Sequence, residues 1–393
     1  MNNQDLYPRK LNIRYVSKET YEGWFRSHPK PGDILLTNKG SQNGAICLVP
    51  DPVDFCIAQD MVALRADSNK VYPLYLFAAL RSELVQKRIK ALNVDAVIPH
   101  LKKTDFDKLY IPLPPKDAQK EIGDWYFALC SRIELLRETN ATLEAIAQAL
   151  FKSWFVDFDP VHARARGEQP AGLAPEVAAL FPDSFEESEL GLVPKGWLVE
   201  PLDEIADFLN GLALQKFPPD GDAELPVIKI AQLRKGDTVG ADRASSKIKP
   251  EYIIQNGDVL FSWSGSLEVE VWCGGEGALN QHLFKVTSQR FQKWFYLRWT
   301  KHHLASFKHI AASKATTMGH IQRKHLTEAM VVVPSPEVMV EADKVFAPLL
   351  EQWVNNALQA QTLATLRDTL LPRLISGQLR LPEAEAALQE AGI

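Results

Sequence analysis

The chain has 393 residues, a formal net charge of −5, and hydrophobic and charged fractions of 46% and 24%. These values are typical of an ordinary globular protein of two or three domains. The sequence contains no signal peptide and no apolar run of about 18 residues, which predicts a cytoplasmic protein without a membrane span. Its four cysteines are scattered without CxxC spacing, which argues against zinc sites and disulfides.

Residues 1–115 are predicted to form an α/β unit. Short strands bounded by turn residues are predicted at residues 32–37, 44–49 and 60–66. An amphipathic helix with basic side chains follows at residues 71–92. A polar loop at residues 95–103 then leads to a last strand at residues 108–114.

Residues 116–155 are predicted to form one long helix with a coiled-coil seam. Apolar or small residues recur in steps of three and four at Leu129, Ile133, Leu136, Leu143, Ala147, Leu150 and Trp154. A seam sustained over four heptads needs a partner helix. Asn140 is the polar position in this seam, and a seam asparagine tends to fix the register of the pair.

The chain repeats this organisation at a constant offset of 220 residues without a gap. Identical residues in the two copies include His100 and His320, Pro114 and Pro334, Glu121 and Glu341, Leu129 and Leu349, Leu143 and Leu363, and Leu150 and Leu370. A solenoid would have a period of ~20–50 residues, so this spacing indicates a duplicated, domain-sized unit.

The second copy is predicted to follow a linker. Residues 156–196 are rich in Pro, Ala and acidic residues and are expected to hold one short helix at most. Residues 197–336 form the second α/β unit, residues 337–377 the second long helix, and residues 378–393 a weakly ordered tail. We expect the two long helices to pair, although each could instead pack on its own unit.

The second helical seam is less regular than the first. Asn356 and Arg367 are polar residues at seam positions. Pro348 is expected to kink the helix or to delay its start, because proline removes a backbone hydrogen bond and clashes with the preceding turn.

The two α/β units differ in length at their beginnings. The second has 60 residues from Trp197 up to Gly257, counting Trp197, whereas 31 residues precede Gly32 in the first. The counterpart of the strand and helix expected after Trp197 is therefore missing from the first unit. A miscalled start codon, a truncated gene or a naturally short unit would each explain this difference.

Basic residues are concentrated in one interval of the second unit. No Asp or Glu occurs between Glu276 and Glu328, an interval that contains Lys285, Arg290, Lys293, Arg298, Lys301, Lys308, Lys314, Arg323 and Lys324. A local basic surface on an acidic chain is what phosphate binding requires, so the interval predicts a phosphate-binding face.

The sequence lacks several common catalytic motifs. It contains no P-loop, no HExxH, no nuclease PD…ExK spacing and no NPP[YF] tetrapeptide. The histidines His302, His303, His309, His320 and His325 have no carboxylate or thiol among them, which favours solvated or phosphate-facing side chains over a metal site. We therefore expect neither catalytic nor metal-binding residues.

Polar loops at matched places in both copies are predicted to bind DNA. Lys and Arg can read guanine and Asn and Gln can read adenine through paired hydrogen bonds. The candidate reading residues are Asn38, Lys39, Ser41, Gln42, Asn43, His100, Lys102 and Lys103, and then Ser262, Trp263, Ser264, Ser266, Thr316, Thr317, His320, Gln322, Arg323 and Lys324. Candidate phosphate contacts are Lys87, Arg88, Lys90, Lys301, Lys308 and Lys314. Any of these loops could instead be a solvated surface.

Several motifs carry a family resemblance that covers essentially the whole chain. They are LFKSWFVDFDPVHARARGEQPAG at residues 150–172, ALFPDSFEESELGLVPKGW at 179–197, GDIL and GDVL at 32–35 and 257–260, IPLPP and VVVPSP at 111–115 and 331–336, and LLPRLISGQL at 370–379. With these motifs the chain resembles the specificity (S) subunit of type I restriction-modification systems.

The resemblance implies a fold and a function. Two tandem α/β (α+β) target recognition domains would each be followed by a long helix, and the helices would pair as an antiparallel coiled coil. Each domain would read one half of a bipartite, asymmetric site in the major groove of double-stranded DNA, and the helices would set the spacer between the halves. The first domain departs from the family pattern because its opening piece is missing, which puts recognition of the first half-site in question.

The resemblance also implies partners. Two methyltransferase (M) subunits would carry S-adenosylmethionine and methylate adenine, and restriction (R) subunits would use ATP and Mg. The chain itself would carry no cofactor and would be a non-catalytic subunit. The competing hypotheses are a two-lobed coiled-coil adaptor without a DNA role, a truncated inactive S subunit, and a stand-alone nuclease.

Overall fold

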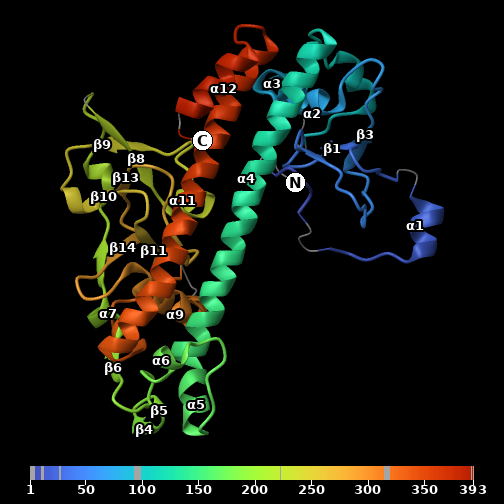
Figure 1. Ribbon diagram of the computed structural model, residues 1–393. Coiled ribbons are helices and arrows are strands. Elements are labelled where there is room, and N and C mark those ends of the chain that lie inside the picture. The colour runs from blue at the N-terminus through green and yellow to red at the C-terminus, as the bar shows by residue number, and fades with distance from the viewer. Residues whose placement is uncertain are drawn as a thin grey trace. The chain divides into compact units, whose positions relative to one another are not determined.

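The computed structural model describes residues 5–9, 13–25, 28–92, 99–221, 223–313, 319–390 and 392. The chain forms two compact units, in which Met1–Glu138 joins Leu358–Ile393 and Thr139–Ala357 stands alone. Glu138 and Leu358 are 220 positions apart, which is the offset of the sequence repeat. Each long helix therefore contributes one part to each unit (Figure 1).

The first unit is built on a small antiparallel sheet. Strand β1 (Ile34–Thr37) lies between β2 (Ile46–Leu48) and β3 (Met61–Leu64). One face of the sheet packs on buried residues of the helices, and Tyr75 and Tyr126 belong to this core. The unit also contains α1 (Lys18–Trp24), the 3-10 helix η1 (Lys103–Lys108) and α12 (Leu381–Glu390).

The helix predicted at residues 71–92 is two helices, so the prediction of a single helix is wrong. Helix α2 (Pro73–Arg81) ends and α3 (Glu83–Ala91) begins at Ser82, which has an extended backbone. The Ser82 hydroxyl caps α3 by accepting from the amide of Val85 at 3.5 Å and donates to the carbonyl of Ala79 at 2.6 Å. Serine competes with helix continuation through such local bonds.

The second unit contains the same three-stranded arrangement with an additional strand. Its sheet has the order β12-β11-β14-β7, and all its neighbouring strands are antiparallel. The bounds are β7 (Asp207–Asn210), β11 (Val259–Ser262), β12 (Val269–Val271) and β14 (Leu283–Thr287). Strands β12, β11 and β14 correspond to β2, β1 and β3, so the duplication read from the sequence is present in the fold.

A second sheet covers the other face of β11 and β14. It has the order β10-β13-β8-β9, with β13 and β8 parallel. The bounds are β8 (Glu224–Ile228), β9 (Arg243–Ser245), β10 (Ile253–Ile254) and β13 (Gly277–Leu279). Buried Ile228, Ile254 and Leu279 pack there on Leu260 and Leu283. Helical segments of this unit are α7 (Leu202–Ile205), η3 (Leu214–Lys216), α8 (Ile230–Lys235), η4 (Pro250–Tyr252), α9 (Lys293–Ser313) and α10 (Lys324–Thr327).

The strand predicted at residues 108–114 is not formed among the described residues. Its counterpart in the second unit, β15 (Met330–Val333), pairs with β6 (Leu198–Pro201). A strand requires a partner for its backbone groups, and the described part of the first unit supplies no equivalent of β6. Instead, Arg88 donates to the carbonyl of Tyr110, and the Tyr75 hydroxyl donates to the carbonyl of Pro112 at 2.6 Å.

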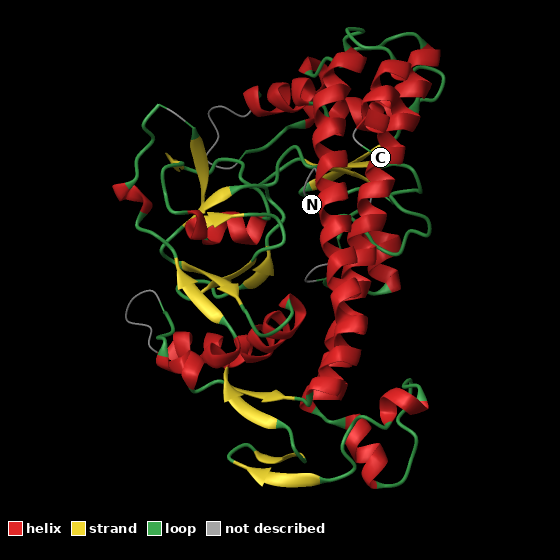
Figure 2. Ribbon diagram, turned by 60° about the vertical axis from the view of Figure 1, so that its left-hand side comes forward, coloured by secondary structure: helices red, strands yellow, loops and turns green. Residues whose placement is uncertain are grey.

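The two long helices are α4 (Lys116–Phe151) and α11 (Pro336–Ile375), and they pair in opposite directions within each unit (Figures 1 and 2). In the first unit, Leu129, Ile133 and Leu136 share a core with residues of α11 that include Leu363 and Leu370. This confirms the predicted seam and the predicted helix pairing.

Helix α11 begins at Pro336 and continues through Pro348, so the expected late start is wrong. Proline inside a helix costs ~3 kcal/mol or more. Buried Ala342 and Phe346 anchor the turns before Pro348, and Leu349, Leu350 and Trp353 pack on the same core after it. Tertiary packing on both sides of the proline therefore supports the continuous helix.

The polar residues of the seam have hydrogen-bond partners. Asn140 donates to the carbonyl of Trp353 at 2.8 Å and accepts from the amide of Asn356 at 3.0 Å. In the first unit, Arg367 lies 3.7 Å from the Cys130 sulfur and 5.8 Å from the centre of the Tyr126 ring. Buried polar groups are tolerated when they are hydrogen-bonded, and these pairs meet that condition.

The segment predicted as a linker is folded and packed. Five π-helical residues, η2 (Lys152–Val156), follow α4, and Phe155, Val161, Phe181 and Val193 are buried in the core of the second unit. The remaining elements are α5 (Asp159–Ala165), α6 (Pro175–Ala178), β4 (Phe185–Ser188) and β5 (Gly191–Pro194), and the last two form a hairpin. The tail is also ordered in part, because α12 buries Ala384.

Candidate nucleic-acid interface

In each unit the two loops predicted as a pair are joined by the same backbone contacts. In the second unit, Ser264 bridges His320, the amide of Gly265 donates to Gly319 at 2.8 Å, and that of Ile321 donates to Trp263 at 3.0 Å. The corresponding bonds in the first unit are the bridge between Lys39 and His100, Gly40 to Pro99 at 3.0 Å and Leu101 to Asn38 at 2.8 Å. The loops around strand β1 or β11 therefore form one surface with the loop about 60 residues later.

A carboxylate, buried in the first unit and partly buried in the second, fixes the start of the strand that leads to each loop surface. Asp33 accepts two bonds from Arg65, at 2.8 and 2.6 Å, and Asp258 pairs with Lys285 at 2.8 Å. Burial alone would raise the pKa of Asp33, but hydrogen bonds from Arg65 and Lys30 outweigh it and lower the pKa. The preceding glycines, at φ +80° and +87°, adopt a conformation that L side chains rarely allow.

The loop surface of the second unit contains a polar and aromatic cluster, which we call the Trp263 cluster and which consists of Asn210, Trp263, Ser264, Gln281, His282 and His320. The Trp263 indole donates to Asn210 Oδ1 at 3.0 Å. Its ring centre lies 6.0 Å from that of His282 and 6.3 Å, edge on, from that of His320. The cluster joins the ends of β7 and β11 to the start of β14, so the added strand β7 completes it.

Hydrogen bonds orient the remaining members of the cluster. Ser264 Oγ lies 2.9 Å from His282 Nδ1, and Gln281 Nε2 lies 3.4 Å from His282 Nε2. Side chains held in this way lose little conformational entropy on binding. Stacked or edge-on aromatic groups beside amides and imidazoles can contact base edges and thymine methyl groups.

Sequence reasoning missed Asn210 and His282. Gln281 aligns with Gln59 in the internal repeat, which was a usable signal for that position and its neighbour. Asn210 lies in the piece of the second unit that has no counterpart in the first. The repeat therefore gave no signal for Asn210.

The structure places Ser262 inside the unit, which weighs against a reading role. Its side chain is fully buried. Its hydroxyl donates to the carbonyl of Ser266 at 2.7 Å and accepts from the amide of Glu268 at 2.7 Å. Ser262 thus shapes the hairpin that presents its neighbours Trp263 and Ser266.

Three exposed residues follow the cluster along the chain. Gln322, Arg323 and Lys324 have exposed side chains. Arg323 Nη2 donates to the carbonyl of Phe208 at 3.1 Å, and its guanidinium lies 5.7 Å from the centre of the Phe284 ring. These contacts orient the guanidinium beside the cluster while its other donors remain accessible. Lys324 makes a long contact of 3.9 Å with exposed Glu328.

The first unit presents a similar set of exposed residues. Lys39, Ser41, Gln42, His100 and Lys102 are exposed at the joined loops. Two amide oxygens in the same region, Asn38 Oδ1 and Asn43 Oδ1, are buried and have no hydrogen-bond partner among the described residues. A buried unsatisfied oxygen costs ~1–3 kcal/mol, so both indicate a site shaped by something other than stability. The Lys103 side chain and Lys314, Thr316 and Thr317 lie outside the described residues.

Many cations of the basic interval have carboxylate partners in the structure, and phosphate binding by this interval stays a prediction. The carboxylates come from other parts of the unit. These pairs are Lys285 with Asp258, Arg290 with Glu200, Arg298 and Lys301 with Glu144, and Lys308 with Glu268. An interval that is free of acids in sequence is therefore not free of acids in space.

The candidate phosphate contacts divide accordingly. Lys301 is partly buried and is held by Glu144, which weighs against phosphate binding in this conformation, whereas Lys308 makes a half-exposed contact of 3.4 Å with Glu268. Lys87 pairs with Glu83 at 2.6 Å on the surface, where such a pair is worth little and can be exchanged for phosphate. Lys90 is exposed.

Two histidines of the interval have internal roles instead of facing solvent. Burial and the neighbouring His302 lower the pKa of His303 to about 4, although a hydrogen bond with the carbonyl of Met330 opposes this shift. His325 is buried, and its Nδ1 accepts from the amide of Gln322 at 2.9 Å. In the described part of the chain, no group of three or more His, Cys, Asp or Glu side chains could hold a metal ion. The described helices include none that is long and apolar enough to cross a membrane.

Comparisons with known proteins agree with the duplicated architecture. A family model described as the type I restriction modification DNA specificity domain matches residues 17–145 and again residues 194–367. The type I restriction enzyme HindI specificity subunit of Haemophilus influenzae is 25% identical over 96% of this chain and 92% of its own. The MjaIX specificity subunit of Methanocaldococcus jannaschii is 24% identical over 97% of this chain and 85% of its own.

A solved structure supports the fold. The crystal structure of the S subunit of a type I restriction-modification system from M. genitalium matches with a TM-score of 0.55 over 88% of this chain and 83% of that chain, at 18% identity. The family model covers most of the sequence, in two segments that follow the two structural copies. The chain therefore belongs to the family of type I restriction-modification DNA specificity subunits.

Proposed function

We propose that this chain is the subunit that selects the DNA sequence in a type I restriction-modification complex. Each α/β domain reads one half of a bipartite, asymmetric site in the major groove, and helices α4 and α11 set the spacer between the halves. The observation that carries this proposal is the pair of loops joined by the same backbone bonds in both units. Two equivalent surfaces on one chain are suited to two separated half-sites.

The surfaces have the chemistry that base reading requires. In the second unit, exposed Gln322 and Arg323 lie beside the Trp263 cluster, and Gln and Arg match adenine and guanine edges. In the first unit, exposed Lys39 and Gln42 occupy the equivalent loop. Exposed cations at the rims, including Lys90 and Lys102, are suited to phosphate contacts that fix register.

The chemistry of the complex belongs to partner subunits in this proposal. Two M subunits bind S-adenosylmethionine and methylate adenine, R subunits use ATP and Mg, and this chain supplies neither active site nor cofactor. The paired helices and the packed segment at residues 156–196 are the parts of the chain available to hold these partners, since neither belongs to the loop surfaces. The family assignment supports this arrangement.

The proposal is tested by mapping methyladenine in a restriction-free host that carries this gene and its neighbouring modification gene. We expect one bipartite motif with a fixed spacer. Replacing Gln322 and Arg323 together by alanine should relax one half of the motif at ~1–3 kcal/mol per lost paired contact, and leave the other half unchanged.

A matched variant in the first unit provides the control. Replacing Lys39 and Gln42 together by alanine should relax the opposite half of the motif. If either double variant weakened both halves equally, the assignment of one surface to each half-site would be wrong. If the unaltered chain gave no bipartite motif, the proposed function itself would fail, and the adaptor hypothesis would gain weight.

A further inference from the structure

Helix α9 connects the second α/β domain to both long helices through one of its faces. Trp294, Arg298 and Lys301 lie four and then three residues apart, so they share a face of α9. The Trp294 indole donates to Asp343 Oδ1 of α11 at 2.6 Å. Arg298 and Lys301 both reach Glu144 of α4.

The contact between α9 and α4 is a bidentate ion pair, whose geometry is strongly directional. Arg298 donates through Nη1 and Nη2 to the two oxygens of Glu144, each at 2.8 Å. Two parallel bonds fix an angle as well as a distance, which a single ammonium contact does not do. The Arg298 side chain is 8% exposed and that of Glu144 34% exposed, so the pair is largely shielded from water and salt.

The charges of this pair are held in place. Burial alone would raise the pKa of Glu144, but Arg298 and Lys301 outweigh it and lower the pKa to about 2. Glu144 is therefore ionised at any physiological pH. Lys301 adds a bond of 3.1 Å to the same carboxylate and lies 3.9 Å from Glu270 of β12.

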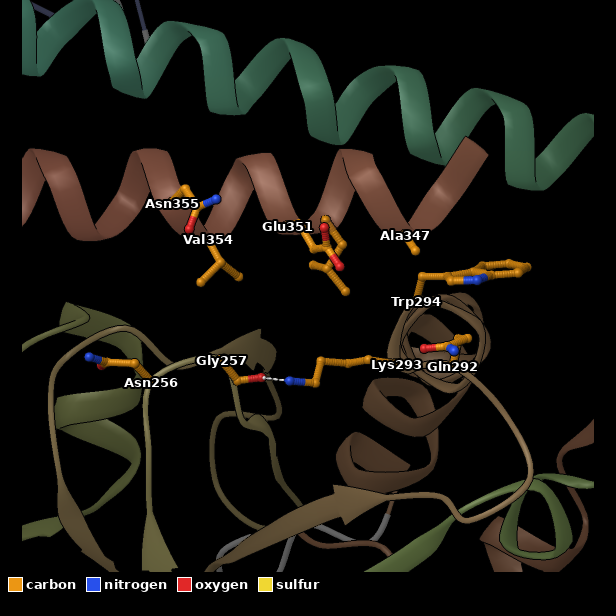
Figure 3. Close-up of a pocket in the computed structure, with 10 residues that line it drawn as sticks. Asn256, Gly257, Gln292, Lys293, Trp294, Ala347, Glu351, Val354 and Asn355 are labelled. Atoms are coloured by element: carbon orange, nitrogen blue, oxygen red, sulfur yellow. Dashed lines mark hydrogen bonds between the residues drawn. The ribbon is translucent and has the colours of Figure 1, made fainter. Parts of the chain in front are cut away.

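Close packing fixes the domain on only part of its α11 side: Trp294 stacks on Phe346 of α11 with ring centres 4.4 Å apart, but a cavity lies beside this contact. A cavity of about 470 Å³ separates the start of α9 and the loop at Asn256 and Gly257 from α11. Figure 3 shows Lys293 turned toward Gly257, with Glu351 and Val354 across the cavity on α11. A domain that borders a cavity on one side can tilt toward it unless directional bonds prevent the tilt.

In the first unit, different contacts hold the α/β domain against the long helices. The counterpart of Asp343 at the repeat offset is Gly123, where a Cβ atom would lie 2.6 Å from the backbone nitrogen of Tyr75. The counterpart of Arg298 is Ala78, which is fully buried. Close backbone packing at Gly123 therefore takes the place of the bond between Trp294 and Asp343, and Ala78 has no charge with which to form an ion pair, so the ion pair is a specific feature of the second unit.

We propose that Arg298 and Glu144, together with Trp294 and Asp343, form a bracket that sets the orientation of the second α/β domain on the long helices, and thereby the DNA spacer length that the protein accepts. This inference rests on the proposed function for its DNA readout. Arg298 and Glu144 are positioning residues, because they lie on α9 and α4 and not at the loop surface. Loosening the bracket should widen the range of accepted spacers without changing either half-site sequence.

The test compares Glu144→Gln with Glu341→Gln, which breaks an exposed ion pair with Lys344 inside α11 itself. Methyladenine is mapped on a library of sites whose spacers differ by one base pair in either direction. We expect Glu144→Gln to lower the preference for the native spacer by roughly tenfold, which corresponds to ~1.4 kcal/mol. Glu341→Gln should leave the preference unchanged, and Arg298→Lys, which keeps the charge but loses the fork, should fall between.

A second readout does not depend on DNA. Spin labels on non-natural amino acids at exposed Gln148 of α4 and exposed Ser266 of the loop surface report the distance between helix and domain. The distance distribution should broaden in Glu144→Gln and not in Glu341→Gln. If the unaltered chain gave no bipartite motif, the proposed function would fail. The distance measurement would still test whether the bracket orients the domain, because it does not require DNA.

Other outcomes overturn the proposal. An unchanged spacer preference in Glu144→Gln with an unchanged distance distribution would show that the pair does not position the domain. A uniform loss of methylation at all spacers, accompanied by a lower melting temperature and an unbroadened distribution, would show that the pair only stabilises the fold. In that case Arg298→Lys, which keeps the positive charge, is used instead, and its spacer preference and distance distribution decide whether the pair positions the domain.

Discussion

Gly123 shows how one residue without a side chain sets the distance between α2 and α4 in the first unit. A Cβ atom there would lie 2.6 Å from the amide nitrogen of Tyr75 and 2.9 Å from the carbonyl carbon of Leu74. Both are backbone atoms, which cannot rotate away as the end of a flexible side chain can. Two further bonds hold the contact, because Tyr72 donates to Gln119 through its amide at 2.9 Å and to Asp124 through its hydroxyl at 2.7 Å.

We predict that Gly123→Ala lowers the free energy of unfolding by ~1–3 kcal/mol or more, because overpacking forces the two helices apart. Gly23→Ala is the matched control, since nothing lies within 4 Å of its added Cβ on α1 and alanine favours the helix. Both variants are compared by urea denaturation. Equal stability of Gly123→Ala and the unaltered chain would mean that α2 and α4 are not in the close contact described.

The sequence predicted the position of a polar residue in a helix seam, but it did not predict which distant residues form ion pairs. Asn140 was singled out as a seam residue, and it does lie in the seam. Lys301 and Lys308 were interpreted as phosphate contacts, and the sequence did not reveal that they also pair with carboxylates of α4 and of the hairpin after β11. A charge count along the chain includes only neighbours in sequence, whereas an ion pair forms between neighbours in space.

At the scale of elements, the polar node between α4 and α11 in the second unit is the clearest determinant of helix register. Asn140 and Asn356 bond to each other, Asn140 bonds to the backbone at Trp353, and Gln352 donates to Asn356 Oδ1 at 2.7 Å. A slide of either helix would separate these groups and leave amides buried without partners. Such nodes specify one register at some cost in stability.

We predict strongly non-additive effects at this node. Asn140→Leu alone should lower the free energy of unfolding by ~1–3 kcal/mol, because it leaves the Asn356 amide buried without its partner. Replacing both asparagines by leucine should restore most of that loss, since an apolar pair at a seam needs no hydrogen bond. Urea unfolding of the two single variants and the double variant measures the coupling. A double variant that lost the sum of both single losses would contradict the node.

Whether a segment forms a strand or a continuous helix depends on neighbouring segments, which the sequence pattern does not reveal. Residues 108–114 have the pattern of a strand and match β15, but β15 exists because β6 lies beside it. The helix at residues 71–92 matched α9 in its periodicity, but the Ser82 cap divides it into α2 and α3. Periodicity predicts which face of a segment is apolar, and the neighbours decide whether the segment becomes a strand or a continuous helix.

At the scale of the whole molecule, the boundary between the two compact units gives a position for testing the spacer role of the helices. The boundary falls after Glu138 in α4 and before Leu358 in α11. An insertion at these two points leaves the contacts inside each unit intact. Seven residues would add ~10.5 Å to each helix at 1.5 Å per residue, which equals the length of about three base pairs.

We predict that one heptad inserted at both points lengthens the accepted DNA spacer by about three base pairs. The two half-site sequences should stay the same, because neither loop surface is altered. Methyladenine mapping measures the spacer directly. A heptad inserted in α4 alone is the control, and it should abolish methylation because it shifts one seam against the other. An unchanged spacer with both insertions would refute the role of the helices as a ruler.

The sequence by itself determined the duplication, the paired helices, the two loop pairs and the family, because these depend on periodicity and motifs that survive as patterns along the chain. Only the tertiary structure decided the register at Asn140, the bracket from α9 to the long helices, and the members Asn210 and His282 of the Trp263 cluster. These features depend on side chains far apart in sequence that fold into contact. The energy of a hydrogen bond or an ion pair depends on distance in space, and the order of residues in one copy of a repeat does not specify that distance.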